Sequence, residues 1–141
     1  MKKLTATAVA IIGLLITSAR AQTGNGGATK TPSQVLLDSV LNTPSLKDQE
    51  VKIVLVTLLP GETGAAHFHL IPAFGYVLEG QYESTFDGKV YIHKAGDAFY
   101  EEPNKVHQQT RTIGDKPAKF LAIFIGDKGK PFIAPSTVLL H

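Results

Sequence analysis

Residues 61–80 read GETGAAHFHLIPAFGYVLEG, and this stretch decides the fold. A turn residue stands at each end, Gly61 and Gly80, and His67 and His69 flank a single phenylalanine between them. In an extended chain alternate side chains project from the same face, so the two imidazoles lie side by side with Cα atoms roughly 6.5 to 7 Å apart. The spacing therefore predicts two converging imidazoles on one strand, although a His-x-His pattern taken alone is weak evidence for a metal site.

The rest of the chain repeats this pattern of short apolar runs separated by turn residues. Most runs are rich in β-branched or aromatic residues and have the length of strands, and Gly or Pro recurs between them, which is typical of an antiparallel all-β sandwich or barrel. Residues 35–41 could also form a short amphipathic helix, but we predict an edge strand there. The predicted strands are 35–41, 51–59, 74–78, 82–86, 90–92, 98–100, 106–112 and 120–125.

The chain length of 141 residues allows one domain with one hydrophobic core. We place this domain at residues 34–141 and expect residues 22–33, which are rich in Gly, Thr and Asn, to form a flexible lead-in. The sequence contains no cysteine, which excludes a disulfide framework, a thiol nucleophile and an iron–sulfur cluster. Any metal site must therefore use His, Asp, Glu or water as ligands.

Residues 1–21 have the pattern of a secretory signal peptide. Two lysines precede an apolar run of 14 residues, Leu4 to Thr17, and Ser18 to Ala21 ends in a small-x-small pattern. A membrane anchor is the alternative, but a membrane-spanning helix needs about 20 apolar residues. We therefore expect cleavage after Ala21 and export to a bacterial periplasm or to the outside of the cell.

The predicted mature chain is almost neutral. Removal of the leader leaves 120 residues, with 11 basic against 12 acidic side chains. They include no basic run and no basic stripe interleaved with aromatics, so we expect neither a nucleic-acid partner nor a membrane partner after cleavage.

Two motifs together resemble those of the cupin superfamily. The first comprises Gly61, then five residues, then the segment from His67 to His69, and later the segment 76–80; the second runs from Gly96 to His107. The resemblance extends over roughly residues 51–125. It implies a single jelly-roll β-barrel, the double-stranded β-helix, in which His67, His69 and His107 bind a divalent metal ion.

The sequence also departs from the family pattern. The family usually has a glutamate ligand after the second histidine, separated from it by three or four residues, where this chain has Ala73 and Phe74. In the second motif Glu102, Asn104 and Arg111 replace the usual Pro, Gly and Asn. The first departure removes a carboxylate, and the second puts the turn before His107 in question.

Three neutral imidazoles can bind iron, manganese, zinc, nickel or copper, and they leave positions on the ion open to a small molecule. On the predicted strand after the first motif, Ala73, Gly75 and Val77 share the metal-facing side. Such small residues could leave space for a ligand. Alternatively, Gly75 marks a bend and Ala73 packs in the core.

Glu101 is the candidate for the missing carboxylate and for the catalytic residue. Strand alternation places it on the same face as Phe99 and opposite Tyr100. It either points into the barrel, as a ligand or general base, or ends the strand in solvent beside Glu102.

Four other polar residues have weaker claims to a role. In an ideal strand Gln109 shares a face with His107 and could support it, although a surface position is the simpler expectation. We expect His93 to be exposed at the end of a hairpin arm, Arg111 to be solvated or salt-bridged rather than to bind an anionic substrate, and His141 to fray at the C-terminus.

These features support three functions: a small metalloenzyme, a barrel that binds or senses a small ligand without turnover, and a metal-free structural barrel. The resemblance implies a dioxygenase- or isomerase-like reaction for the enzyme and does not choose between them. Three histidines at matching motif positions disfavour the metal-free barrel. We also expect a homodimer formed through the edge strand at residues 35–41.

Overall fold

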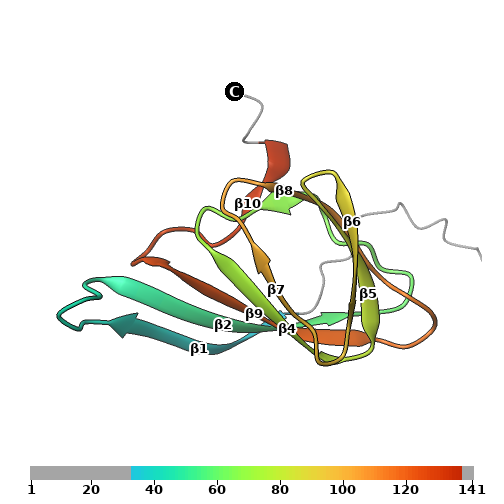
Figure 1. The fold of residues 1–141 in the computed structure, drawn as a ribbon, viewed down its shortest axis with the longest axis horizontal. Coiled ribbons are helices and arrows are strands. Elements are labelled where there is room, and N and C mark those ends of the chain that lie inside the picture. Colours follow the sequence, from blue (N-terminus) through green and yellow to red (C-terminus); the bar gives the residue numbers. More distant parts are fainter. Residues whose placement is uncertain (1–32, 138–141) are drawn as a thin grey trace, which may run out of the picture.

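The computed structural model describes residues 33–137, which form two antiparallel five-stranded sheets (Figure 1). The predicted all-β class and the double-stranded β-helix architecture are confirmed. The predicted signal peptide, all of the lead-in except Ser33, and His141 lie outside the described residues. The strands are β1 (Ser33–Leu41), β2 (Gln49–Leu58), β3 (His67–Phe68), β4 (Ala73–Glu79), β5 (Gln81–Phe86), β6 (Lys89–Lys94), β7 (Ala98–Glu101), β8 (Val106–Thr112), β9 (Ala118–Asp127) and β10 (Ala134–Pro135).

The first sheet has the strand order β1-β2-β9-β4-β7, and the second has the order β10-β3-β8-β5-β6. All eight predicted strands are present, within a few residues of the expected bounds. β3 and β10 are only two residues long and pair with each other. No helix among residues 33–137 is long and apolar enough to cross a membrane.

The core lies between the two sheets. One cluster joins Leu58, Val77 and Ala118 from the first sheet to Tyr82 from the second, and each of these side chains is at most 2% exposed. A second cluster is built around Val54, Ile71, Ala73 and Phe124. Because large side chains of both sheets meet in the first cluster, it fixes the distance between the sheets.

Strand β4 alternates as the sequence predicts. Ala73 and Val77 are buried, whereas Phe74 and Tyr76 are exposed on the outer face of the sheet. The position of Gly75 corrects the expectation of free space there, because a Cβ atom on Gly75 would overlap the ring of Phe99. Because Gly75 has no side chain, the ring of Phe99 packs directly against the backbone at this position.

The turn before His107 contains Asn104, one of the positions where the sequence departs from the family motif. Asn104 adopts a left-handed conformation, with φ of 62°, which asparagine tolerates better than most residues. Its backbone N–H donates a 2.7 Å hydrogen bond to the carbonyl of His69. The turn thus ties the loop before β8 to the end of the His-x-His segment.

Strand β1 is the edge strand that the sequence predicts, since it pairs only with β2 in its sheet. The side chains of Val35, Leu36 and Leu37 are 43 to 53% exposed. A homodimer through this strand stays a prediction.

Candidate metal centre

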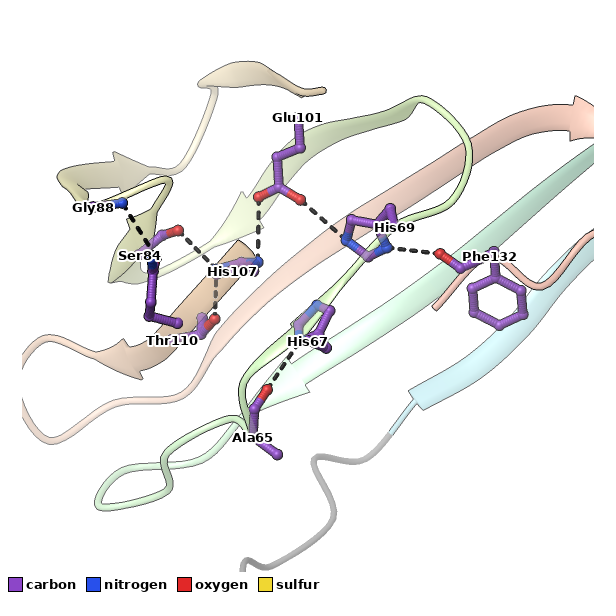
Figure 2. A network of polar contacts seen from close by, with 10 residues as sticks. Ala65, His67, His69, Ser84, Gly88, Glu101, His107, Thr110 and Phe132 are labelled. Carbon is purple, nitrogen blue, oxygen red and sulfur yellow. Dashed lines mark hydrogen bonds and ion pairs between the residues drawn. The ribbon is translucent and has the colours of Figure 1, made fainter. Parts of the chain in front are cut away.

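Three histidines and one glutamate gather inside the barrel (Figure 2). His67 on β3 is the cross-strand partner of His107 on β8, and its ring centroid lies 4.9 Å from that of His107 and 5.0 Å from that of His69. Glu101 reaches the group from the end of β7. His69, His107 and Glu101 are 5 to 7% exposed. The structure thus brings all four predicted site residues together.

Two backbone carbonyls orient His67 and His69. Nδ1 of His67 lies 2.8 Å from the carbonyl oxygen of Ala65, and Nδ1 of His69 lies 2.7 Å from that of Phe132. Because a carbonyl can only accept, each Nδ1 carries the proton and donates. In the neutral rings Nε2 then holds the free lone pair, which is the state that a metal ligand needs.

Two hydroxyl groups hold His107 at its Nε2 atom, whereas His67 and His69 are held at Nδ1. Its Nε2 lies 2.8 Å from the Oγ of Ser84 and 2.9 Å from the Oγ1 of Thr110, and both oxygens can accept its proton. Its Nδ1 is buried and has no hydrogen-bond partner among the described residues. Such an unpaired buried atom costs about 1 to 3 kcal/mol, a cost that a bound cation removes.

The carboxylate of Glu101 approaches two of these rings. Its Oε2 lies 3.2 Å from Nε2 of His69, and its Oε1 lies 3.5 Å from Nδ1 of His107. An ionised carboxylate offers only lone pairs, and so does Nε2 of a neutral His69. A proton or a metal ion must therefore lie between them for the contact to be favourable.

The backbone register explains how Glu101 comes to this place. Its cross-strand partner is Ala73, the residue where the family usually has its glutamate. Directly opposed residues of an antiparallel pair project to the same face. A carboxylate thus lies on the strand next to this position, and Glu101 points inward rather than ending the strand in solvent.

Burial decides the protonation of the histidines. It lowers the pKa of His67 and lowers the pKa of His107 from 6.5 to about 4. For Glu101 burial alone would raise the pKa, but a proton on Nε2 of His69, donated to the carboxylate, and the positive charge of protonated histidines outweigh burial and lower the pKa. Near neutral pH the site therefore holds neutral His107 and ionised Glu101, which are the forms that bind metal.

The donor set fits a divalent ion. One nitrogen from each of His67, His69 and His107 lies within 4.8 Å of the other two. Two nitrogens bound to one ion at about 2.1 Å can be at most about 4.2 Å apart, so the rings need only a small convergence. The unpaired Nδ1 of His107 is the feature that such an ion explains best.

The metal-free protein is expected to lose about 2 to 3 kcal/mol of unfolding free energy as the pH falls from 6.5 to 4. In this window the unfolded chain protonates His107 and the folded chain does not, so acid favours unfolding. The lowered pKa of Glu101 acts in the same direction at lower pH. Urea unfolding of EDTA-treated protein at pH 7, 6, 5 and 4 measures the effect. A His107→Gln variant with the same pH slope as wild type would contradict it.

The structure places two of the weaker candidates, Gln109 and Arg111, away from the histidine group. The register shifts where the consecutive residues Thr85 and Phe86 of β5 face Gln109 and His107 of β8, so β8 contains one extra residue, and Thr110, not Gln109, shares the buried side with His107. Arg111 is on the surface in a two-bond ion pair with Glu83, as the default expectation had it.

The prediction of an exposed His93 is wrong. Its ring is half-buried and packs against Phe99 at 4.4 Å and Tyr82 at 5.0 Å between centroids. Burial lowers the pKa of His93. The strand pairing Tyr82↔His93 places its ring beside Tyr82 of the first core cluster.

Sequence reasoning missed Ser84 and Thr110. Strand alternation places Ser84 on the same inward face as Tyr82. A serine on a buried face needs a hydrogen-bond partner, and this need is the signal that could have identified Ser84. No comparable signal exists for Thr110, because it becomes the neighbour of His107 only through the bulge.

A cavity of about 640 Å³ opens beside this group. His67, His69, His107 and Glu101 form part of its wall, and the remaining wall is mostly apolar and aromatic. This size and composition are typical of a site for one small organic molecule.

A family model described as a cupin domain matches residues 54–124. No match to a curated protein is found. Among solved structures, a conserved protein with a double-stranded β-helix domain from Klebsiella pneumoniae matches with a TM-score of 0.60 and 22% identity, over 79% of this chain and 90% of that chain. This likeness supports the fold alone.

An oxalate decarboxylase from Bacillus subtilis that contains Mn(II) centres matches with a TM-score of 0.54 and 27% identity, over 64% of this chain. The match spans only 25% of that enzyme's chain. A DMSP lyase matches with a TM-score of 0.54 and 18% identity, over 61% of this chain and 44% of that one.

Proposed function

Because the chain belongs to the cupin domain family, we propose that it is a metal-dependent enzyme acting on a small oxygen-bearing molecule inside the barrel. The observation that carries the proposal is the unpartnered Nδ1 of His107, which faces the carboxylate of Glu101 at the wall of a 640 Å³ cavity. A site built only for stability would not leave this atom unpaired.

His67, His69 and His107 would hold the ion, which we propose to be divalent iron, manganese, zinc, nickel or copper. When bound, such an ion polarises an oxygen atom of the substrate or acidifies a water molecule. The carbonyls of Ala65 and Phe132 keep two of the rings in the tautomer that binds, and this support commonly changes metal affinity 10- to 100-fold.

Glu101 is proposed as the carboxylate of the site, either as a fourth ligand or as the group that accepts a proton from the substrate. Its burial, its two histidine contacts and its lowered pKa keep it ionised and fixed in place. The reaction is proposed to be dioxygenase- or isomerase-like. Export of the enzyme is proposed from the leader pattern of residues 1–21.

Turnover by the metal-containing protein, assayed with panels of phenolic, sugar and keto-acid compounds, tests the proposal. We expect a Glu101→Gln variant to lose on the order of 100-fold or more in turnover if Glu101 is the base. If it is a ligand, we expect the metal affinity to fall about 10- to 100-fold as well. Glu102→Gln is the matched control, because Glu102 is the exposed neighbour and should change neither quantity.

The cross-strand pairing supplies a rescue test. Ala73→Glu in a Glu101→Ala background returns the carboxylate to the strand opposite, and we expect it to restore part of the lost metal affinity. Unchanged metal content and turnover in Glu101→Gln would contradict the role of Glu101. Absence of turnover across all panels, together with tight binding of one compound, would make the protein a binding module.

A further inference from the structure

The cavity wall is aromatic on both sides of the histidine group. On one side Phe124 packs against His69 at 5.1 Å and against Phe132 at 4.8 Å between ring centroids. On the other side Tyr82 stacks on Phe120 at 5.0 Å. All four aromatic rings line the cavity. A molecule bound at the histidines is therefore surrounded by ring faces and edges, which favour another flat ring.

The wall carries almost no charge. Among the described lining residues there is no lysine, arginine or aspartate, and Glu101 is the one carboxylate. The exposed lining residues, where the cavity meets solvent, are uncharged as well: Ser33, Val35, Ala65, Ala66, Phe74, Ile133 and Pro135. An anion would pass an apolar entrance and then meet the negative charge of Glu101, and the proposed metal ion would be its one cationic partner, because no cationic side chain is among the described lining residues.

Lys52 lies on the inward-facing side of β2, but it forms its ion pairs outside the cavity. The ammonium group of Lys52 lies over the ring of Phe132 at 5.0 Å and forms ion pairs with Glu50 at 2.7 Å and Asp38 at 3.2 Å. Phe132 lines the cavity and Lys52 does not. The described wall therefore has no cationic side chain that could pair with a second carboxylate of a small diacid.

From these observations we propose that the substrate is an uncharged aromatic molecule that presents one or two oxygen atoms to the His67, His69, His107 and Glu101 group. This inference rests on the proposed function and narrows its substrate class. It separates this chain from the oxalate decarboxylases that share its fold, since oxalate is a two-carbon dianion and the cavity is far larger than such a molecule.

Isothermal titration calorimetry of the purified protein with its measured metal content tests the proposal. Catechol, 1,2-cyclohexanediol and oxalate each present two adjacent oxygen atoms but differ in ring character and charge. We expect catechol to bind at least about tenfold more tightly than either of the others, because only catechol is both flat and uncharged. Oxalate binding at least as tight as that of catechol would overturn the inference, and equal binding of the cyclic diol would overturn its aromatic part.

A matched pair of variants separates charge from bulk. Ala122 lines the cavity between Phe120 and Phe124 on β9. Ala122→Lys adds an ammonium group there and should reverse the preference in favour of oxalate, whereas Ala122→Met adds similar length without charge and should keep catechol ahead. Circular dichroism checks that both variants fold, and the wild-type comparison stands on its own if they do not.

The metal content distinguishes the two possible failures. A wild-type protein that contains no metal, takes up none and binds none of the three compounds contradicts the proposed function itself. A protein that contains metal and prefers oxalate contradicts only the substrate class.

Discussion

Replacing both His67 and His69 with alanine is expected to lower the affinity for a divalent ion on the order of a thousandfold or more. Removal of an outer hydrogen-bond partner of a metal ligand alone costs about 10- to 100-fold, and this double variant removes two direct ligands. Metal analysis of the purified proteins should find near-stoichiometric metal in wild type and almost none in the variant. EDTA should lower the melting temperature of wild type and leave that of the variant unchanged.

His93→Ala is the matched control for this experiment. It also removes a histidine from the interior, but its ring packs against Phe99 and Tyr82 and takes no part in the metal group. We expect it to keep its metal while losing some stability. Equal metal content in wild type and the double variant would remove the ligand assignment.

Gly75→Ala is expected to lower the free energy of unfolding by about 3 kcal/mol, a large effect for one methyl group. The new Cβ would overlap the Cζ, Cε1 and Cε2 atoms of Phe99. That ring cannot move aside easily, because its centroid lies 4.4 Å from His93, 6.4 Å from Tyr82 and 6.2 Å from Phe120. Urea unfolding monitored by far-ultraviolet circular dichroism measures the loss.

Two further variants test the cause of this loss. Gly88→Ala serves as the control, because Gly88 has a φ of 75° but no atom within 4 Å of an added Cβ, so it reports backbone strain of about 1 kcal/mol without overlap. Phe99→Leu in the Gly75→Ala background shortens the opposing side chain and should recover part of the stability. A loss no larger than that of Gly88→Ala, or an absence of coupling between positions 75 and 99, would contradict the packing argument.

Much of the fold was predictable from local patterns. Turn residues and alternation predict all the long strands, because half-buried strands of antiparallel sheets expose every second residue. The two-residue strands β3 and β10 are too short to show alternation, and the second of them has no signal in the sequence. The left-handed conformation of Asn104 does have a local signal, because the family motif usually has a glycine there and asparagine tolerates a positive φ better than most residues.

The candidate site was predictable in composition but not in detail. The spacing of the histidines identifies three of its members, and alternation tells that Glu101 shares a face with Phe99. Which face turns inward depends on the long-range pairing of Ala73 with Glu101, and no local pattern encodes that register. The same holds for Thr110, which reaches His107 because of one bulge, and for His93, whose burial depends on rings from two other strands.

The difference in strand length has a consequence for local unfolding. The ladder between β2 and β9 extends over ten residue pairs, whereas β3 forms two pairs with β8 and two with β10. Opening of the segment around β3 therefore breaks few hydrogen bonds and leaves the long ladder intact, so its free energy lies well below that of global unfolding. An ion that binds only the closed segment raises this opening free energy by mass action, so amide hydrogen exchange around His67 reports metal occupancy while exchange in β9 reports the stability of the whole barrel.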